Sequence, residues 1–411
     1  MVGVPCLAEC LFAARLLKFS WAGMRDAFLL TPLSATLLYT VLLQALQAAS
    51  GSTRQTCEQS LSPIFTAHPN FAPARNASRQ ALNVHTRKTT DRRVWDCIPL
   101  GYEIDMLWLH MRTLQHVVDG FIVTESDTTH TTTRKKPLLL TEIMANGSLP
   151  KELAGVSISV HAVEYQKHKH RFCSSGGPPV RCFENFQRFM LVEALLQVAG
   201  PNDLALFGDV DEIARPSVVS MLAWCYPFDG RLDWHAPYYI LRLTLLKFGL
   251  HCDHGNTFIQ GTRAFSVAAL KTDYGNYKTA TPQQLSQMSF AFSHTRLQRH
   301  MPVIPSAGWH LTSLGEPWEL ERKMATWLHA NIFVDPRSRD LHRIERCQHY
   351  CLELAPTRGQ TDWPPCTSRD DPKSTHLPGR VITRLRDADL PAPLIHERSR
   401  YPSSWYRYVA D

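Results

Sequence analysis

From about Asp91 onward, the apolar positions of the chain alternate between helical spacing and short strand-like runs. Ile104 to Val118 places apolar residues three and four positions apart, which predicts a helix with one buried face. Gly120 to Glu125 and Asp203 to Gly208 are short apolar runs with the character of strands. The pattern predicts further strands at Val156 to Val163, Tyr238 to Leu250 and Thr262 to Leu270, and helices at Phe183 to Val198 and from Pro317 to about Asn331. This alternation predicts an α/β fold with a mostly parallel central sheet.

A long apolar run lies near the N-terminus, from Phe28 to Ala49. As a helix it spans roughly 33 Å, enough for a hydrocarbon core about 30 Å thick. Arg15, Lys18 and Arg25 precede it, and a positive flank favours a cytosolic N-terminus. We therefore expect a cytosolic tail over residues 1–26 and a transmembrane signal anchor over 27–49. A cleaved signal peptide and a buried helix are the alternatives.

Composition narrows the class of protein. The chain has 411 residues, 44% of them hydrophobic and 20% charged, with a net charge of +7. These values are ordinary for a globular protein and exclude wholesale disorder, collagen and coiled coil. The sequence contains no dense run of Lys and Arg with interleaved aromatic residues, so it gives no indication of nucleic-acid binding.

Cysteines and glycosylation triplets agree with a secretory lumen. Nine of the 11 cysteines follow the apolar run, enough for several disulfide bonds, although an odd number leaves at least one outside an intrachain pair. Asn76-Ala77-Ser78 and Asn146-Gly147-Ser148 are acceptor triplets for N-glycosylation. Zinc is a rival explanation for Cys347 and Cys351, but no second ligand pair follows at metal spacing.

The remaining segments predict the domain plan. Residues 50–90 are rich in Ser, Thr, Asn, Pro and Gln and have the composition of a stem or linker. Residues 91–355 carry the alternating pattern and form the expected catalytic domain. Residues 356–411 are rich in Pro and Arg, and we expect a loosely structured tail there.

The sharpest chemical feature is the acidic turn Asp209-Val210-Asp211-Glu212, which follows an apolar strand and a glycine. Two carboxylates at positions i and i+2 can converge on one Mg²⁺ or Mn²⁺ ion. Ligands of open α/β sheets bind beyond the carboxyl ends of the strands, where this turn is expected to lie. The alternative is a solvated turn that caps the next helix.

Other residues fit the same site. Glu125 ends a strand and is a candidate for binding the ribose or base of a nucleotide. His310, in Ala307-Gly308-Trp309-His310, is a candidate third metal ligand. Glu184, Asn185 and Arg188 fall within about one helical turn, where they can hold the acidic turn, contact a sugar or form a surface ion pair.

In order and spacing, these stretches resemble glycosyltransferase family 17, whose best-known activity adds the bisecting GlcNAc to N-glycans. The resemblance covers about Asp91 to Cys347. It departs from the family pattern at Asp127 to Lys136 and at Leu311-Thr312. The matching stretches are Val117–Ser126, Glu184 and Asn185 with Arg188, Asp203–Ile213 with Pro216, Ala307–His310, Lys323, and Arg339–Ile344.

The resemblance implies a GT-A-like fold in a single-pass type II Golgi membrane protein. It also implies an inverting transfer of GlcNAc from UDP-GlcNAc to the β-linked mannose of an N-glycan core, in β-1,4 linkage. The implied cofactor is Mn²⁺ or Mg²⁺, held against the diphosphate by Asp209, Asp211 and His310. Oligomeric state is left open.

The remaining residues have expected roles in the same reaction, and Glu212 is also a candidate for binding the acceptor sugar. Glu125, Asp209, Arg188 and Lys323 would bind the donor, and Glu184, Asn185 and Trp309 would support the site. Asp211 would act in catalysis, and Glu212, Glu316 and Glu319 are the candidates for the base that accepts the acceptor's proton. The rival functions are a haloacid-dehalogenase-like phosphohydrolase with Asp209 as its nucleophile, and a non-catalytic membrane-tethered glycan-binding protein.

Overall fold

The computed structural model describes residues 92–130, 135–165, 167, 179–225, 238–246, 253–279, 303–311, 314–326, 340–342, 344, 390–401 and 405. The predicted cytosolic tail, signal anchor and stem fall outside these ranges. Within them, no helix has the length and apolar character needed to cross a membrane.

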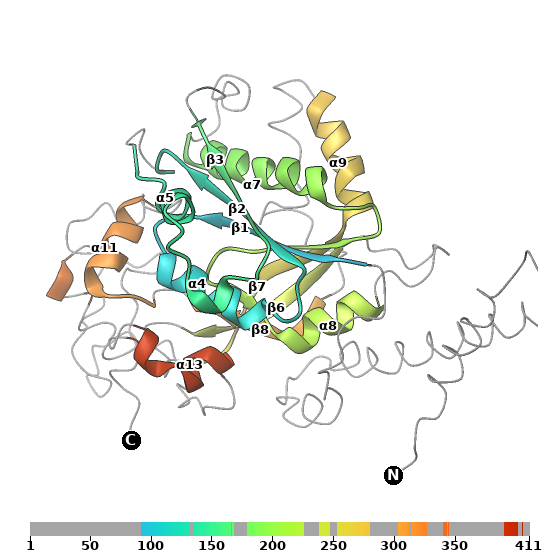
Figure 1. Cartoon of the computed structure of the whole chain (residues 1–411). Helices are drawn as coiled ribbons and strands as arrows, with labels where there is room; N and C mark the ends of the chain where they lie inside the picture. Colours follow the sequence, from blue (N-terminus) through green and yellow to red (C-terminus); the bar gives the residue numbers. More distant parts are fainter. Residues whose placement is uncertain are drawn as a thin grey trace, which may run out of the picture. The chain divides into compact units, whose positions relative to one another are not determined.

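The centre of the domain is an eight-stranded sheet in the order β3-β2-β1-β4-β7-β6-β8-β5 (Figure 1). The four strands β3, β2, β1 and β4 are parallel, whereas β7 is antiparallel to β4 and to β6. Strand β8 is parallel to β6, and β5 is antiparallel to β8. The α/β class is confirmed, and the GT-A assignment stays a prediction. The strands are β1 (Val94–Leu100), β2 (Gly120–Ser126), β3 (Ile158–Val163), β4 (Leu204–Phe207), β5 (Glu212–Ala214), β6 (Tyr238–Leu246), β7 (Asp253–Ser266) and β8 (Val303–His310).

Helices cover both faces of the sheet. Helices α7 and α9 lie on one face, and α4 and α8 lie on the other (Figure 1). The helices are α4 (Ile104–Leu114), α5 (Leu139–Ala145), α7 (Pro179–Val198), α8 (Pro216–Cys225), α9 (Val267–Thr279), α11 (Pro317–Thr326) and α13 (Ala392–His396), with short 3₁₀ turns η1 (Lys151–Leu153) and η6 (Arg398–Arg400).

Most of the predicted elements appear near their expected bounds, but β1, β5, β8, α5, α8 and α13 were not predicted. The strand expected over Thr262 to Leu270 ends at Ser266, and Val267 begins α9. Strand β1 was not predicted, although it pairs with both β2 and β4. Its sequence VWDCIPL contains Asp96 and Pro99, and a proline inside a run argues against a strand. The residues of β1 are buried on both faces of the sheet, and this burial stabilises the strand despite the proline.

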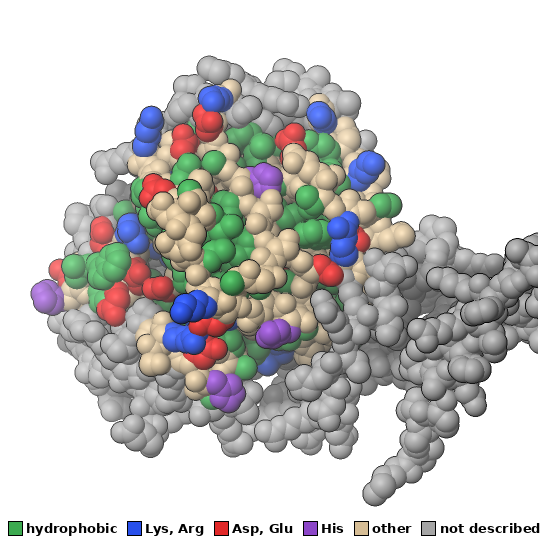
Figure 2. Space-filling model, viewed as in Figure 1, with side chains coloured by type: hydrophobic (Ala, Val, Ile, Leu, Met, Phe, Trp, Pro, Cys, Tyr) green, Lys and Arg blue, Asp and Glu red, His purple; other side chains and the backbone are tan. Residues whose placement is uncertain are grey.

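The visible surface of the domain is mixed in charge. Figure 2 shows basic and acidic side chains interspersed over the face in view, without one dense basic area. This agrees with the small net charge of the chain and gives no sign of a nucleic-acid surface on that face.

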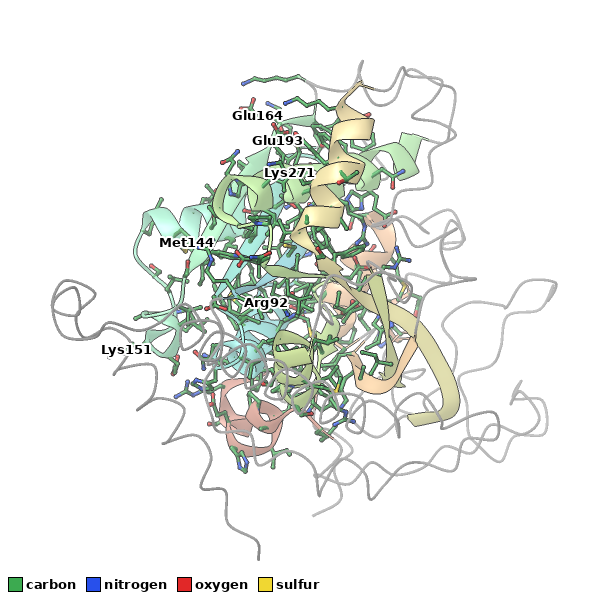
Figure 3. All side chains as sticks on the ribbon, turned by 90° about the vertical axis from the view of Figure 1, so that its right-hand side faces the viewer. Arg92, Met144, Lys151, Glu164, Glu193 and Lys271 are labelled. Atoms are coloured by element: carbon green, nitrogen blue, oxygen red, sulfur yellow. The ribbon has the colours of Figure 1, made fainter. Side chains whose placement is uncertain are left out.

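A continuous apolar core joins the sheet to α7 and α9. The Phe207 and Phe265 rings of neighbouring strands meet edge to face at 5.5 Å, and Phe189 of α7 stacks on Tyr274 of α9 at 5.0 Å. Figure 3 shows α9, with Lys271 labelled on it, standing beside the sheet. Cys97, a free cysteine, lies buried in this core.

The C-terminal segment corrects the expectation of a loose tail. Residues 390–401 and Trp405 are ordered against α4: Leu394 is fully buried, and Tyr401 stacks on Trp405 at 5.4 Å. The Arg112 guanidinium of α4 donates to the Tyr401 hydroxyl at 3.4 Å. Residues beyond the predicted boundary at residue 355 therefore pack against the folded domain through Leu394, Tyr401 and Trp405.

Replacing Leu394 with alanine is expected to lower the free energy of unfolding by about 2–3 kcal/mol, since it removes a fully buried side chain. Urea denaturation of the full-length protein would measure the loss. His396→Ala in the same helix is the matched control, because His396 is exposed and its replacement should change little. Equal stabilities of Leu394→Ala and the wild type would show that the segment does not belong to the folded core.

Candidate active site

The acidic turn lies at the carboxyl end of β4, as predicted. Gly208 precedes it at a point where the chain approaches β7 closely: a Cβ atom there would lie 2.4 Å from Oγ1 of Thr262. The same hydroxyl donates to the backbone carbonyl of Glu212 at 2.8 Å. Gly208 thus lets the turn be anchored directly on the neighbouring strand.

Asp211 is the buried centre of the site, with 5% of its surface exposed. The Lys323 ammonium donates to its Oδ2 at 2.9 Å, and Nε2 of His310 lies 3.5 Å from its Oδ1. Burial alone would raise the pKa of Asp211, but Lys323 and His310 outweigh it and hold that pKa well below its ordinary value. Asp211 is therefore a permanent buried anion.

Strand pairing brings His310 to this carboxylate. In the antiparallel pair β5 and β8, Glu212 lies opposite His310, and the backbone N–H of Leu311 donates to the Asp211 carbonyl at 2.8 Å. Burial lowers the pKa of His310, but the adjacent Asp211 outweighs it, and the pKa is raised. The short pairing of β5 with β8 thus brings together the acidic turn and His310, which are about 100 positions apart in sequence.

Lys323 connects the acidic turn to the loop after β1. Its Nζ lies 3.4 Å from Oε1 of Glu103 in addition to its bond with Asp211. Burial opposes its charge, but these two carboxylates raise its pKa. Lys323 therefore remains protonated and places a positive charge beside Asp211, where a diphosphate can use it.

Asp209 points to a different partner. Its Oδ1 accepts a hydrogen bond from Nη2 of Arg188, whose Nε donates to Oε1 of Glu184 at 3.1 Å. Glu184 and Arg188 thus lie on one face of α7, and of the predicted alternatives the structure has Arg188 in contact with the acidic turn. Arg188 is 3% exposed, and its carboxylate neighbours raise its pKa against the effect of burial. Asn185 lies half-buried on the same helix.

The three-ligand metal set Asp209, Asp211 and His310 is not assembled. Among the residues that the structure describes, no three acidic, histidine or cysteine side chains are close enough to hold a metal ion. Asp209 is instead paired with Arg188. Asp211 and His310 do lie together, and Nδ1 of His310 is buried without a hydrogen-bond partner in the described part of the chain.

These two residues fit a cation that binds together with a phosphate group. Carboxylate and imidazole groups are ligands that Mn²⁺ accepts. Magnesium in nucleotide sites is commonly held by one or two carboxylates plus substrate phosphates and waters, without a cage made only of protein. The donor set therefore supports a site completed by the substrate.

Glu125 has structural partners in place of the predicted donor contact. It is fully buried, and its oxygens accept hydrogen bonds from the backbone N–H groups of Leu140 and Thr141 at 3.2 and 3.1 Å. Lys136 lies 3.8 Å from it. Glu125 therefore caps the first turn of α5, and these contacts give its predicted role in donor binding no support.

The remaining predicted residues surround the turn or lie at the start of α11. Trp309 is buried, with the Arg215 guanidinium 4.3 Å from its ring centroid. Glu212 is 2% exposed, and its Oε2 accepts from the Asp209 N–H at 3.1 Å. The Glu319 carboxylate accepts from the Glu316 N–H at 2.8 Å, and burial raises its pKa.

One pair near the turn escaped the sequence reasoning. His110 of α4 and Asp96 of β1 are each 1% exposed, and Nε2 of His110 lies 2.8 Å from Oδ2 of Asp96. Nδ1 of the same ring lies 2.9 Å from the Val210 carbonyl, in the middle of the acidic turn. A histidine within an apolar helical stripe was the available signal. The sequence carried no corresponding signal for Asp96, because β1 was not predicted.

Solved glycosyltransferase structures with low similarity were found by comparison. A mannosyltransferase from Pyrobaculum calidifontis, in complex with GDP-Man and Mn²⁺, has 10% identity and a TM-score of 0.29, over 74% of this chain and 80% of that one. Glucosyl-3-phosphoglycerate synthase from Mycobacterium tuberculosis, in complex with UDP, has 12% identity and a TM-score of 0.27, over 53% and 71%. Mouse xyloside xylosyltransferase 1 has 11% identity and a TM-score of 0.24, over 48% and 74%.

A comparison with curated protein sequences found no match. The family comparison is decisive, because the profile of glycosyltransferase family 17 matches residues 24–244, more than half of the chain and including the acidic turn. The chain belongs to glycosyltransferase family 17.

Proposed function

We propose that this glycosyltransferase transfers GlcNAc from UDP-GlcNAc to the β-linked mannose of an N-glycan core, with inversion and in β-1,4 linkage. Glycosyl transfer follows from membership of the family. The donor, acceptor and linkage are the finer part of the proposal and rest on the resemblance of the sequence motifs.

The observation that carries the proposal is the buried Asp211 between Lys323 and His310, at the carboxyl end of β4. A nucleotide-sugar donor leaves as a diphosphate, on which negative charge develops. Fixed positive groups in a buried site stabilise such charge most effectively when they are already in place. Lys323 is held in this way by Asp211 and Glu103 before any substrate arrives.

A divalent cation, Mn²⁺ or Mg²⁺, is the proposed cofactor. Asp211 and His310 would hold it, together with phosphate oxygens of the donor. When bound, it would neutralise charge on the leaving diphosphate. Arg188 keeps Asp209 oriented beside this position through their ion pair.

An inverting displacement also requires a carboxylate to take the proton from the acceptor hydroxyl. Glu212, Glu316 and Glu319 remain the candidates. Burial raises the pKa of Glu319, which moves this carboxylate toward the neutral range where a general base works best.

The proposed location is the Golgi membrane, with a type II orientation and a luminal catalytic domain. The charged flank and length of the apolar run at Phe28 to Ala49 support it. An N-glycan acceptor requires a luminal site.

A donor screen tests the proposed function. Full-length protein in detergent is incubated with Mn²⁺, an N-glycan core oligosaccharide and each of several UDP-sugars, and the products are identified by mass spectrometry. We expect turnover with UDP-GlcNAc that is lost on chelation and restored by Mn²⁺. Turnover with another UDP-sugar would refute the donor assignment, and no turnover with any UDP-sugar would favour a glycan-binding protein.

A separate trapping experiment tests the phosphohydrolase alternative. That reading needs Asp209 to attack a phosphoryl group as a nucleophile. In the structure the Asp209 carboxylate is paired with Arg188, and the family match points to glycosyl transfer. An aspartyl-phosphate trapped on Asp209 would overturn the proposed function.

A further inference from the structure

We propose that Glu103 is a positioning residue of the active site, which keeps the Lys323 ammonium beside the donor diphosphate when Asp211 binds the cation. This inference rests on the proposed function, because it assigns a role to a further residue of the same site. Glu103 directly precedes helix α4, and no sequence motif singled it out. Only its contacts in the folded chain point to this role.

The Lys323 ammonium is shared between two carboxylates from separate elements. Its Nζ lies 2.9 Å from Oδ2 of Asp211 after β4, and 3.4 Å from Oε1 of Glu103 at the start of α4. The Asp211 side chain is 7% exposed, whereas the Glu103 side chain is 28% exposed. The ammonium therefore bridges the buried centre of the site and a carboxylate that is partly open to solvent.

Glu103 is held in place by its own segment of backbone. Its carbonyl accepts from the N–H of Leu107 at 3.0 Å, and its Oε2 accepts from the N–H of Tyr102 at 2.8 Å. The carboxylate makes no capping hydrogen bond to α4, a helix that the structure describes throughout. It turns back over Gly101, where a Cβ atom would lie 2.4 Å from Oε2. One oxygen is thus anchored locally, and the other faces Lys323.

Asp211 has two uses that compete with each other. Its Oδ2 already accepts from Lys323, and a divalent cation held by Asp211 and His310 would repel an ammonium on the same carboxylate. Glu103 gives that ammonium a second partner of opposite charge, so Lys323 stays in the site when its bond to Asp211 weakens. The positive charge then remains where a diphosphate can use it.

The first test measures UDP binding at saturating Mn²⁺ by calorimetric titration of the full-length protein in detergent. Glu103→Gln keeps the size of the side chain and an oxygen for the Tyr102 N–H, but it removes the charge. We expect its affinity for UDP to fall about tenfold, the scale of one lost charge-assisted contact. Glu321→Gln is the matched control, because Glu321 lies half-buried on the same helix as Lys323 and the substitution removes the same charge. It should bind UDP as the wild type does.

A double variant shows whether Glu103 acts through Lys323. Lys323→Met should weaken UDP binding by itself, and adding Glu103→Gln to it should cause no further loss. Glu103→Asp, which keeps the charge on a shorter side chain, should show a smaller loss that also disappears in Lys323→Met, and it decides the question if Glu103→Gln does not fold. Additive losses, or an unchanged UDP affinity in the single Glu103 variants, would overturn the positioning role. Circular dichroism of each variant checks its folding.

Binding of Mn²⁺ without nucleotide gives a readout that a purely structural role would not change. Free Mn²⁺ is followed by electron paramagnetic resonance during titration of the metal-free, full-length protein. Lys323→Met should bind Mn²⁺ about tenfold more tightly than the wild type, because Asp211 is released from its ammonium partner. Glu103→Gln should bind Mn²⁺ more weakly, but not when Lys323 is also replaced. Equal Mn²⁺ affinities in the wild type and these variants would reject the positioning role.

These measurements also separate this inference from the proposed function, since none of them needs turnover. If UDP affinity depends on Glu103 through Lys323 but no UDP-sugar is turned over, the positioning role stands and the transferase proposal fails. If UDP-GlcNAc is turned over and Glu103→Gln binds UDP as the wild type does, the transferase proposal stands and the positioning role fails. A wild type that does not bind UDP would reject both.

Discussion

Replacing Asp211 with asparagine is expected to lower the rate of sugar transfer by about two to three orders of magnitude. The substitution keeps the size of the side chain but removes the negative charge that holds Lys323 at 2.9 Å and faces His310. Without that anion the proposed cation loses a ligand, and Lys323 loses one of its two carboxylate partners. Initial rates with the productive UDP-sugar, measured over a range of Mn²⁺ concentrations, would check this result.

Asp209→Asn is the matched control for this experiment. Its side chain is 37% exposed and is paired with Arg188, so we expect a clearly smaller loss than for Asp211→Asn. Circular dichroism of both variants should match the wild type. A larger loss in Asp209→Asn than in Asp211→Asn would contradict the assignment of Asp211 as the central carboxylate.

Replacing His110 with glutamine is expected to lower the free energy of unfolding by about 3–5 kcal/mol. Both ring nitrogens of His110 face acceptors, the Val210 carbonyl at 2.9 Å and Oδ2 of Asp96 at 2.8 Å. When both nitrogens donate to these acceptors, the ring is protonated and positively charged. The substitution therefore leaves the buried Asp96 charge without its counterion and weakens the tether on the acidic turn. Urea unfolding at neutral pH would measure the loss.

The pH dependence of this loss has a definite sign. Burial lowers the pKa of His110, but Asp96 outweighs it, and the pKa is raised above its ordinary value of 6.5. A raised pKa in the folded state gives a stabilisation that is complete below 6.5 and is lost as pH rises through the folded value. The difference in stability between wild type and His110→Gln should therefore shrink as pH rises above neutrality. A difference that grows with pH would contradict the charged pair.

A double variant separates the pair from other effects of His110. Asp96→Asn combined with His110→Gln removes both charges, so it should cost less than the sum of the two single substitutions. Additive losses would show that the two side chains do not depend on each other. Whether or not the losses are additive, His110→Gln alone should also reduce the rate of sugar transfer. The reason is that His110 contacts the carbonyl of Val210, which belongs to the acidic turn.

Several parts of the site could be predicted from local sequence alone. The apolar run before Gly208 and the acids after it placed a carboxylate turn at the end of a strand, and the structure has this turn after β4. The helical spacing of Glu184 and Arg188 indicated a shared face, which the 3.1 Å contact confirms. Such inferences succeed because strand and helix periodicities fix which neighbours within a few residues share a face.

Other features depended on contacts that no local pattern encodes. Glu125 ends a strand in the same way as the acidic turn does, yet it caps α5 because that helix begins directly over its carboxylate. The loose C-terminal tail expected over residues 390–401 differs from the structure, in which Leu394 is fully buried and its helix α13 lies against α4. The composition of a segment does not show which other elements it packs against.

The sequence by itself determined the α/β class, the family and the acidic turn, because each depends on residue type and short spacing along one segment. Only the tertiary structure decided which carboxylate is central, since that depends on partners from distant elements. Arg188 of α7 forms an ion pair with Asp209, whereas Lys323 of α11 and His310 of β8 contact Asp211. The long-range packing of helices onto one sheet sets these partnerships, and the chemistry of each acid follows from the charge placed beside it.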